Sequence, residues 1–442
     1  MLDRRQLAYG RSVIIRTLTC VMFLFFTGCP NGCDNPGPGA GIRWISYPAL
    51  ATSTTSYNWL VVKCQLSDNS AIPAGLDTNI QKFLGIGGTG YGNIVDYFHD
   101  VSYNRASVIG TEFVGWVTAP FGTRDLAFPN GRLAPASARA ARVKECLQAI
   151  PAEQGVNLED FYGVVVINNA VNDGGACYIG QQNLSINNKN YKLACVWFDP
   201  NSLFTDFGAH ELAHGLGLPH SYDDSGRNCG GASGEYCDPW DIMSAMGTYT
   251  FVDKNWLING ASSGGGPGMN AAMLLRMGWI PAANQKRYDL EEGGNQLFKL
   301  RALSHAQPGN TLVAILNVGA TASDGVYTVE YRQGDGWDSG FVSHPNAPAP
   351  VQSKGGTVLV HQFRIAGEPA SMLLDGAYGG ALQPFDTLVL PGFGGTIYHV
   401  TVKAMNTQNA SATVEIGSGR GPALPRFGIE GMRLNERIHP NP

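Results

Sequence analysis

A chain of 442 residues, of which 44% are hydrophobic and 15% are charged, is long enough to bury a sizeable core and to form two or three domains of ordinary size. Its 30 Lys and Arg residues are outnumbered by 35 Asp and Glu residues, and the absence of a dense basic run argues against nucleic acid as a partner. The low charge and the 57 glycines are typical of exported proteins that are rich in loops.

Residues 1–28 have the pattern of a secretory signal peptide, with four arginines before an apolar run at 18–26. The run is shorter than the about 20 residues of a permanent membrane span. Residues 26–29, Phe-Thr-Gly-Cys, resemble the lipobox of bacterial lipoproteins, which suggests a lipid anchor on Cys29. The alternative is an ordinary signal peptide that leaves Cys29 free to pair with Cys33. Both alternatives place the protein outside the cytoplasm, secreted or anchored to the cell envelope.

Residues 29–56 are rich in Pro, Gly, Ser and Thr and predict a flexible tether or a short pro-segment. From residue 57, apolar runs alternate with helical patterns. We expect strands at 58–66, 106–118, 161–167 and 191–198, and helices at 93–102 and 134–150. This alternation predicts an α/β domain over residues 57–284.

A change of pattern near residue 285 predicts an all-β, sandwich-like domain over residues 285–417. Gly and Pro turns separate short alternating segments at 311–316, 325–331, 357–363, 396–403 and 412–416. Nothing in this part assembles a second active site, so we expect a packing or binding module. Residues 418–442 are expected to form an irregular tail.

Nine cysteines are consistent with an oxidising compartment, where disulfides persist. Spacing suggests three pairs, Cys229 with Cys237, Cys177 with Cys195, and Cys64 with Cys146. The alternative for these thiols is structural zinc. It has less support, because only Cys29 and Cys33 have the close spacing that such sites favour.

The run at 210–220, His-Glu-Leu-Ala-His-Gly-Leu-Gly-Leu-Pro-His, carries the clearest chemistry. Residues 203–217 have a helical composition, so His210 and His214 lie one turn apart on one face and can bind the same metal ion. Glu211 lies one position further round the helix, where it can hold a water molecule and accept its proton.

We expect the helix to end at Gly217, because a residue without Cβ adopts the left-handed conformation that turns the chain back. The turn brings His220 toward the other two histidines. Three neutral imidazoles leave the fourth position of a tetrahedral metal open, which is the arrangement of a catalytic site.

The pattern His-Glu-x-x-His-x-x-Gly-x-x-His resembles that of the metzincins, zinc peptidases that also carry a Met-turn beneath the metal. Residues 240–244, Trp-Asp-Ile-Met-Ser, are similar to that turn, with Met243 as its methionine and Met246 as the alternative. The astacin and serralysin branches place a tyrosine ligand two residues after this methionine, but here that residue is Ala245. Segments 97–103, 115–116, 277–280 and 330–338 are similar to immune inhibitor A-like and gametolysin-like peptidases.

The resemblance implies a metzincin-like catalytic domain, one catalytic Zn²⁺, and a zinc metalloendopeptidase that hydrolyses proteins or peptides with Glu211 as general base. Two alternatives remain: a catalytically silent surface binding protein that uses the β-domain, and a zinc peptidase that acts on cell-wall peptides.

Asp223 and Asp224 suggest either a Ca²⁺ site or a solvated turn. Few oxygen atoms are local to them, whereas calcium takes about 6 to 8.

Overall fold

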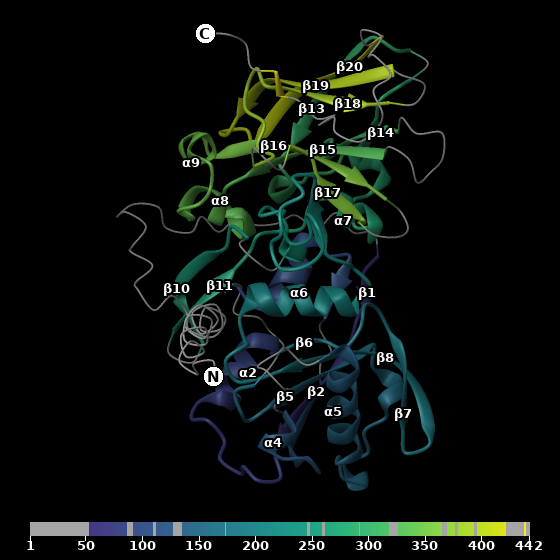
Figure 1. Cartoon of the computed structure of the whole chain (residues 1–442), viewed down its shortest axis with the longest axis vertical. Coiled ribbons are helices and arrows are strands. Elements are labelled where there is room, and N and C mark those ends of the chain that lie inside the picture. The colour runs from purple at the N-terminus through teal and green to yellow at the C-terminus, as the bar shows by residue number, and fades with distance from the viewer. Residues whose placement is uncertain are drawn as a thin grey trace, which may run out of the picture.

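The computed structural model describes residues 53–85, 92–108, 112–126, 135–172, 174–244, 248–258, 261–290, 292–317, 326–364, 369–375, 379–392, 396–420 and 437–438. The expected signal peptide, Cys29 and most of the expected tether and tail lie outside these residues. Within them, the chain forms a mixed α/β fold with several sheets and few helices (Figure 1). None of the helices in the described part of the chain is long and apolar enough to cross a membrane.

The first sheet contains the N-terminal strands in the order β4-β2-β5-β8-β6. These strands are β2 (Trp59–Gln65), β4 (Glu112–Thr118), β5 (Gly163–Asn168), β8 (Lys189–Phe198) and β6 (Gly175–Ala176), and β7 (Gln182–Ile186) also pairs with β8. The first four are parallel to one another, whereas β6 and β7 run antiparallel to β8. Every residue of β5 is buried, which explains the apolar run at 164–167.

Helices cover both faces of the first sheet. One hydrophobic cluster joins Trp59 and Val61 of β2 to the helices α2 (Leu76–Leu84), α3 (Ile94–Val101) and α6 (Thr205–Gly215). A second cluster joins the intervening Leu60 and Val62 to α5 (Ala136–Gln148), because successive residues of a strand point to opposite faces. The Cys64–Cys146 disulfide links β2 to α5 on this second face.

Two further sheets form the later part of the chain. The second sheet has the order β12-β14-β15-β16-β17-β9, with β12 (Gln285–Arg287), β14 (Val313–Asn317), β15 (Val326–Gln333), β16 (Gly356–Phe363), β17 (Ser371–Leu373) and β9 (Ser221–Asp223). The third has the order β13-β20-β19-β18-β21, with β13 (Asn295–Arg301), β20 (Ser411–Arg420), β19 (Thr396–Asn406), β18 (Thr387–Pro391) and β21 (Arg437–Ile438). One hydrophobic cluster contains side chains from both sheets, as in a sandwich.

The second sheet includes a strand from the earlier part of the chain. β9, which directly follows His220, pairs in parallel with β17, so that Ser221 lies opposite Ser371. The largest hydrophobic cluster also contains residues from both sides of the expected boundary at 284, including Trp59 and Val313. The division into domains at 284 therefore stays a prediction.

The remaining elements adjust several expected boundaries. β1 (Thr55–Ser56) pairs with β3 (Ala106–Ser107), so the last two residues of the expected tether belong to a sheet. β20 continues to Arg420, and β21 pairs with β18, so neither segment is irregular as the tail prediction required. The other elements are α4 (Thr123–Leu126), β10 (Phe251–Ile258), β11 (Ala261–Gly265), α7 (Ala271–Arg276), α8 (Gly340–Ser343) and α9 (Ala349–Lys354).

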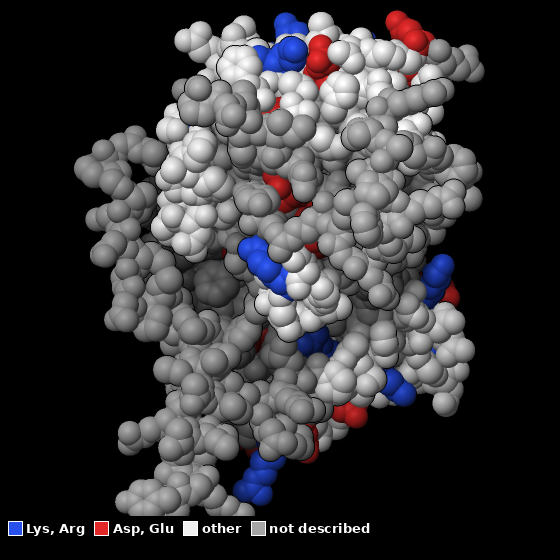
Figure 2. Space-filling model, turned by 45° about the horizontal axis from the view of Figure 1, so that its top comes forward, with Lys and Arg blue, Asp and Glu red and all other residues white. Residues whose placement is uncertain are grey.

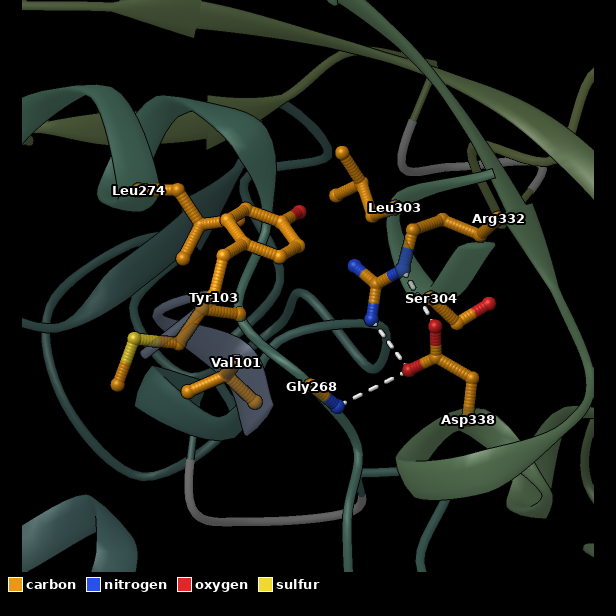
Figure 3. A pocket seen from close by; sticks show the side chains of 9 residues that line it. Val101, Tyr103, Gly268, Leu274, Leu303, Ser304, Arg332 and Asp338 are labelled. Carbon is orange, nitrogen blue, oxygen red and sulfur yellow. Dashed lines mark hydrogen bonds and ion pairs between the residues drawn. The ribbon is translucent and has the colours of Figure 1, made fainter. Parts of the chain in front are cut away.

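A buried ion-pair cluster lies beside a small cavity where the first part of the chain meets the second sheet (Figure 3). Arg332 on β15 donates to the two carboxylate oxygens of Asp338 at 2.5 and 2.8 Å and to Glu330 at 3.2 Å. Asp338 also accepts a hydrogen bond from the backbone N–H of Gly268 at 2.9 Å. Each charge therefore has partners, as burial requires. Among the described residues visible in Figure 2, the exposed charged side chains are few and of both signs.

Candidate metal centre

Helix α6 packs tightly against the first sheet and lies between that sheet and the later ones (Figure 1). A Cβ on Gly215 would lie 2.7 Å from a ring carbon of Trp59, so glycine is what allows the last turn to approach β2. The carbonyl groups at the end of the helix also find hydrogen-bond donors. That of His214 accepts hydrogen bonds from the N–H groups of Gly180 and Gly217, at 2.7 and 2.9 Å. These contacts fix the end of α6 in place.

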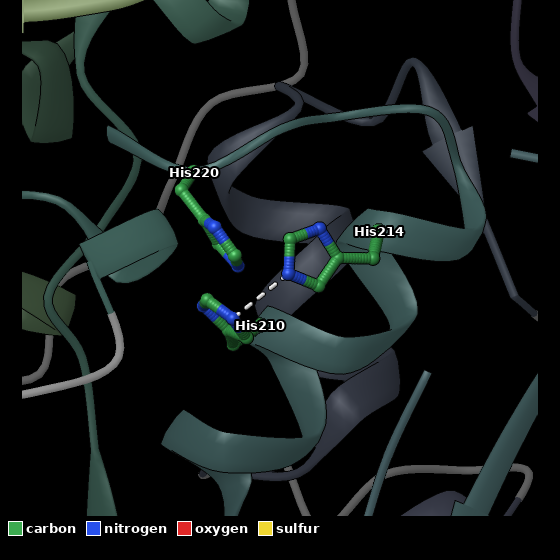
Figure 4. A group of neighbouring side chains, drawn as sticks. All are labelled: His210, His214 and His220. Atoms are coloured by element: carbon green, nitrogen blue, oxygen red, sulfur yellow. Dashed lines mark hydrogen bonds between the residues drawn. The ribbon is translucent and has the colours of Figure 1, made fainter. Parts of the chain in front are cut away.

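His210 and His214 project from α6 toward one point (Figure 4). Nδ1 of His210 donates to the carbonyl of Ile242 at 2.8 Å, and Nδ1 of His214 donates to the carbonyl of Leu218 at 2.7 Å. A carbonyl oxygen accepts hydrogen bonds and does not donate them, so both rings carry their proton on Nδ1. Each Nε2 therefore has a free lone pair, which is the form that binds a metal.

The two Nε2 atoms of His210 and His214 lie 2.9 Å apart. Burial lowers the pKa of each ring to about 3, so both are neutral and no proton lies between the two lone pairs. A cation between them would remove this repulsion. Two nitrogens that bind one tetrahedral zinc are about 3.3 Å apart, close to the separation seen here. The donor set therefore fits a zinc ion.

The third histidine reaches the site through the turn after α6. Gly217 has φ of +99°, in the left-handed region, and the N–H of Leu218 donates to the carbonyl of Ala213 at 3.0 Å. The ring of His220 then lies nearly parallel to that of His210, with 5.6 Å between the ring centroids and 14° between the planes.

The three histidines offer nitrogen atoms that all lie within 4.8 Å of one another. In the described residues they are the only group of three or more His, Cys, Asp or Glu side chains that can hold a metal ion. The metal ligands predicted from the motif are thus brought together. Asp223 and Asp224 are not part of such a group. The carboxylate of Asp223 is 2.6 Å from both Arg227 Nη2 and Ser225 Oγ, and that of Asp224 accepts from the N–H of Asp375.

The side chain of Glu211 is buried and held in one orientation. Its Oε2 accepts a hydrogen bond from the backbone N–H of Ala176 at 2.6 Å. Ala176 is the last residue of β6, and the next residue, Cys177, forms a disulfide with Cys195 of β8. One carboxylate oxygen is thus tied to the edge of the first sheet.

Met243 is fully buried in a short 3-10 helix at Ile242–Ser244. Its N–H donates to Asp241 Oδ1 at 2.8 Å, which shapes the turn. Burial, reinforced by the nearby charge of Asp238, raises the pKa of Asp241. This turn contributes the Ile242 carbonyl that orients His210. Ala245 and Met246 lie outside the described residues.

Two residues near His220 belong to no motif that the sequence reveals. Glu235 Oε1 lies 2.5 Å from His220 Nδ1, and the hydroxyl of Tyr236 lies 2.9 Å from His220 Nε2. Both belong to the loop closed by the Cys229–Cys237 disulfide. Burial, together with the charges of Glu235 and Glu211, raises the pKa of Tyr236, so its phenol keeps its proton. The signal available in the sequence was a cysteine-bounded loop that follows the third histidine closely.

No family model matches the chain, and no curated protein matches it. Among the solved structures that are similar to it is metalloproteinase-II from Bacteroides fragilis, with 16% sequence identity and a TM-score of 0.23. The match covers 42% of this chain and 49% of that chain, so the similarity spans about half the length of that structure.

Proposed function

We propose that the protein is a zinc metalloendopeptidase of the metzincin type that hydrolyses peptide bonds in proteins, with Glu211 as general base. The observation that carries this proposal is the convergence of nitrogen atoms from three histidines, one of which precedes a buried carboxylate in the chain. His210 and His214 present neutral rings with unprotonated Nε2 atoms, and the third ring is close enough to bind the same ion.

The ligand set supports a catalytic role over a purely structural one. A structural zinc site usually has four protein ligands, whereas three histidines leave a position for water or substrate. When bound, zinc lowers the pKa of a coordinated water molecule and polarises a carbonyl group. Glu211 accepts the proton of the attacking water and then gives it to the leaving amine nitrogen. Its hydrogen bond to Ala176 keeps the carboxylate oriented for both transfers.

The proposed setting is extracellular, either secreted or tethered to the envelope through Cys29. Three disulfides support an oxidising environment: Cys64–Cys146, Cys177–Cys195 and Cys229–Cys237. All three pairings are those that the cysteine spacing suggested. The proposed substrate is a protein or peptide, and the second and third sheets are proposed to act as a packing or binding module.

The test is cleavage of casein by the purified chain, with and without a zinc chelator, together with metal analysis. Glu211→Gln keeps the shape of the side chain and an oxygen for the Ala176 N–H. It should retain about one zinc per chain and lose about 10²- to 10⁴-fold in rate. His220→Ala should instead lower the zinc content.

Glu112→Gln is the matched control, because Glu112 is an exposed residue of β4. It should cleave casein as the wild type does. Full activity of Glu211→Gln would contradict its role as base. Zinc binding without cleavage of casein, gelatin or cell-wall peptides would favour the alternative of a silent binding protein.

A further inference from the structure

Tyr236 is held close to the metal-binding side of His220. Its backbone N–H donates to the carbonyl of Ser221 at 3.0 Å, and its ring centroid lies 4.2 Å from that of His220. Its φ is +63°, in the left-handed region that residues other than glycine seldom adopt. Strained backbone of this kind persists where the surrounding structure imposes it, and it concentrates at functional sites.

The hydrogen bonds of His220 define what the Tyr236 hydroxyl does. Nδ1 of His220 lies 2.5 Å from a carboxylate oxygen of Glu235, so in the neutral ring, which is the form that binds a metal, Nδ1 carries the proton and Nε2 carries the lone pair. In that neutral form the hydroxyl of Tyr236, 2.9 Å away, donates a hydrogen bond to the lone pair of Nε2. A metal ion that binds His220 uses the same lone pair. Binding of a metal ion would take this lone pair from the phenol and leave its hydroxyl to donate to another acceptor at the site.

We propose that Tyr236 is a catalytic residue whose hydroxyl donates a hydrogen bond to the carbonyl oxygen of the scissile peptide as that oxygen gains negative charge. This inference rests on the proposed peptidase function. A substrate carbonyl drawn to a metal ion held by the three histidines would be an acceptor near the Tyr236 hydroxyl, which already lies 2.9 Å from His220 Nε2. The pairing of β9 with β17 and the Cys229–Cys237 disulfide keep the loop beside the site.

Hydrolysis of the peptide bond in this scheme needs only the substrate and one water molecule. Glu211 takes a proton from water as the water oxygen bonds to the carbonyl carbon, and the π electron pair of the carbonyl moves to its oxygen. The Tyr236 hydroxyl stabilises this oxygen by a hydrogen bond and keeps its own proton. When the electron pair returns, the C–N bond breaks and the leaving nitrogen receives the proton from Glu211.

The experiment compares Tyr236→Phe with the wild type in casein-peptide cleavage and in zinc affinity. Loss of a donor to the developing oxyanion should lower kcat about 10²- to 10³-fold with KM nearly unchanged. Without the competing hydroxyl, Nε2 of His220 should bind zinc about three- to tenfold more tightly in competition with a chelating dye. Tyr191→Phe, on β8, is the matched control and should change neither quantity.

The cobalt-substituted protein separates a hydrogen-bond donor from a metal ligand. The visible spectrum of cobalt-loaded Tyr236→Phe should match that of the cobalt-loaded wild type, because the phenol does not coordinate the metal. A changed spectrum with weaker zinc binding would identify Tyr236 as a ligand and overturn the proposed role. An unchanged kcat would also overturn it. If the wild type binds zinc but cleaves nothing, the peptidase proposal fails. The zinc affinity of Tyr236→Phe then still decides whether its hydroxyl competes for His220.

Discussion

Glu235 and His220 form a close carboxylate–imidazole pair, with 2.5 Å between Oε1 and Nδ1. The other carboxylate oxygen accepts a hydrogen bond from the N–H of Ala232 at 2.6 Å, so the carboxylate cannot rotate freely. A carboxylate behind a metal-binding histidine fixes the ring orientation and makes the opposite nitrogen a better ligand. In the proposed zinc site, Glu235 is therefore a positioning residue for His220.

Glu235→Ala should weaken zinc binding about 10- to 100-fold, because His220 loses the group that fixes its tautomer and orientation. The measurement is a zinc titration against a chelating dye. Glu153→Ala, at an exposed glutamate of the described chain, should bind zinc as the wild type does. Equal affinities of Glu235→Ala and wild type would show that the pair does not position His220.

Two of the disulfides should have separable effects. Cys64–Cys146 joins residues 82 positions apart, whereas Cys229–Cys237 joins residues only 8 apart. Chain entropy predicts that loss of the first costs about 4.5 kcal/mol of unfolding free energy and loss of the second about 2.5 kcal/mol. Only the loop closed by Cys229–Cys237 carries Glu235 and Tyr236. Loss of this disulfide should therefore lower the zinc affinity more than loss of Cys64–Cys146 does.

Double Cys→Ser variants of each pair test this prediction by urea unfolding and zinc titration. The Cys229/Cys237 variant should lose more zinc affinity, and the Cys64/Cys146 variant should lose more stability. Equal losses of zinc affinity in the two variants would mean that the site responds to global stability and not to the local loop.

The sequence predicts the strands that are buried on both faces more readily than those at sheet edges. β5 and β8 contain apolar runs because helices cover the first sheet on both sides. β9 contains only Ser221–Asp223, and its partner β17 lies about 150 residues further along. Three residues are too few to show an alternating pattern, so the link between the two parts of the chain could not be predicted.

The grouping of the three histidines could be predicted because their relationship is local. The spacing of His210 and His214 is one helical turn, and Gly217 supplies the bend that precedes the third histidine. The residues that hold Glu211 and His210 in place could not be predicted in this way. Ala176 and Ile242 act through backbone N–H and carbonyl groups, which any residue provides, so no side-chain pattern marks them.

The stability of the chelator-treated protein should fall as the pH decreases. Burial lowers the pKa of His210 and of His214 to about 3, whereas a histidine in the unfolded chain has an unperturbed pKa of about 6.5. Between these values the unfolded chain binds more protons than the folded chain, so acid favours unfolding. Each ring should contribute a slope of up to about 1.4 kcal/mol per pH unit.

Urea unfolding between pH 6 and pH 4, with chelator present, measures this slope. The His210→Gln/His214→Gln double variant is the matched comparison, because other acidic groups titrate in the same range in both proteins. The wild type should lose up to about 2.7 kcal/mol per pH unit more than the variant. Parallel curves would show that the two rings are not held neutral in the folded chain.

Buried and exposed ion pairs in this protein should differ strongly in their contribution to stability. Arg332 has a side chain only 1% exposed and contacts Asp338 and Glu330, whereas the side chains of Lys189 and Glu159 are 53% and 60% exposed. Arg332→Met leaves two carboxylates buried without their cation and should cost about 3 to 5 kcal/mol of unfolding free energy. Lys189→Met breaks the solvent-exposed ion pair with Glu159, whose N–O distance is 2.8 Å. This change should cost less than about 1 kcal/mol of unfolding free energy.

Urea unfolding at neutral pH measures both changes. Because buried carboxylates without a cation can be neutralised by protonation, the deficit of Arg332→Met relative to wild type should shrink as the pH falls toward 4. Asp338→Asn in the Arg332→Met background should recover part of the lost stability, since it removes one of the uncompensated charges. If Arg332→Met and Lys189→Met are equally stable, the buried Arg332 cluster contributes no more to stability than an exposed ion pair.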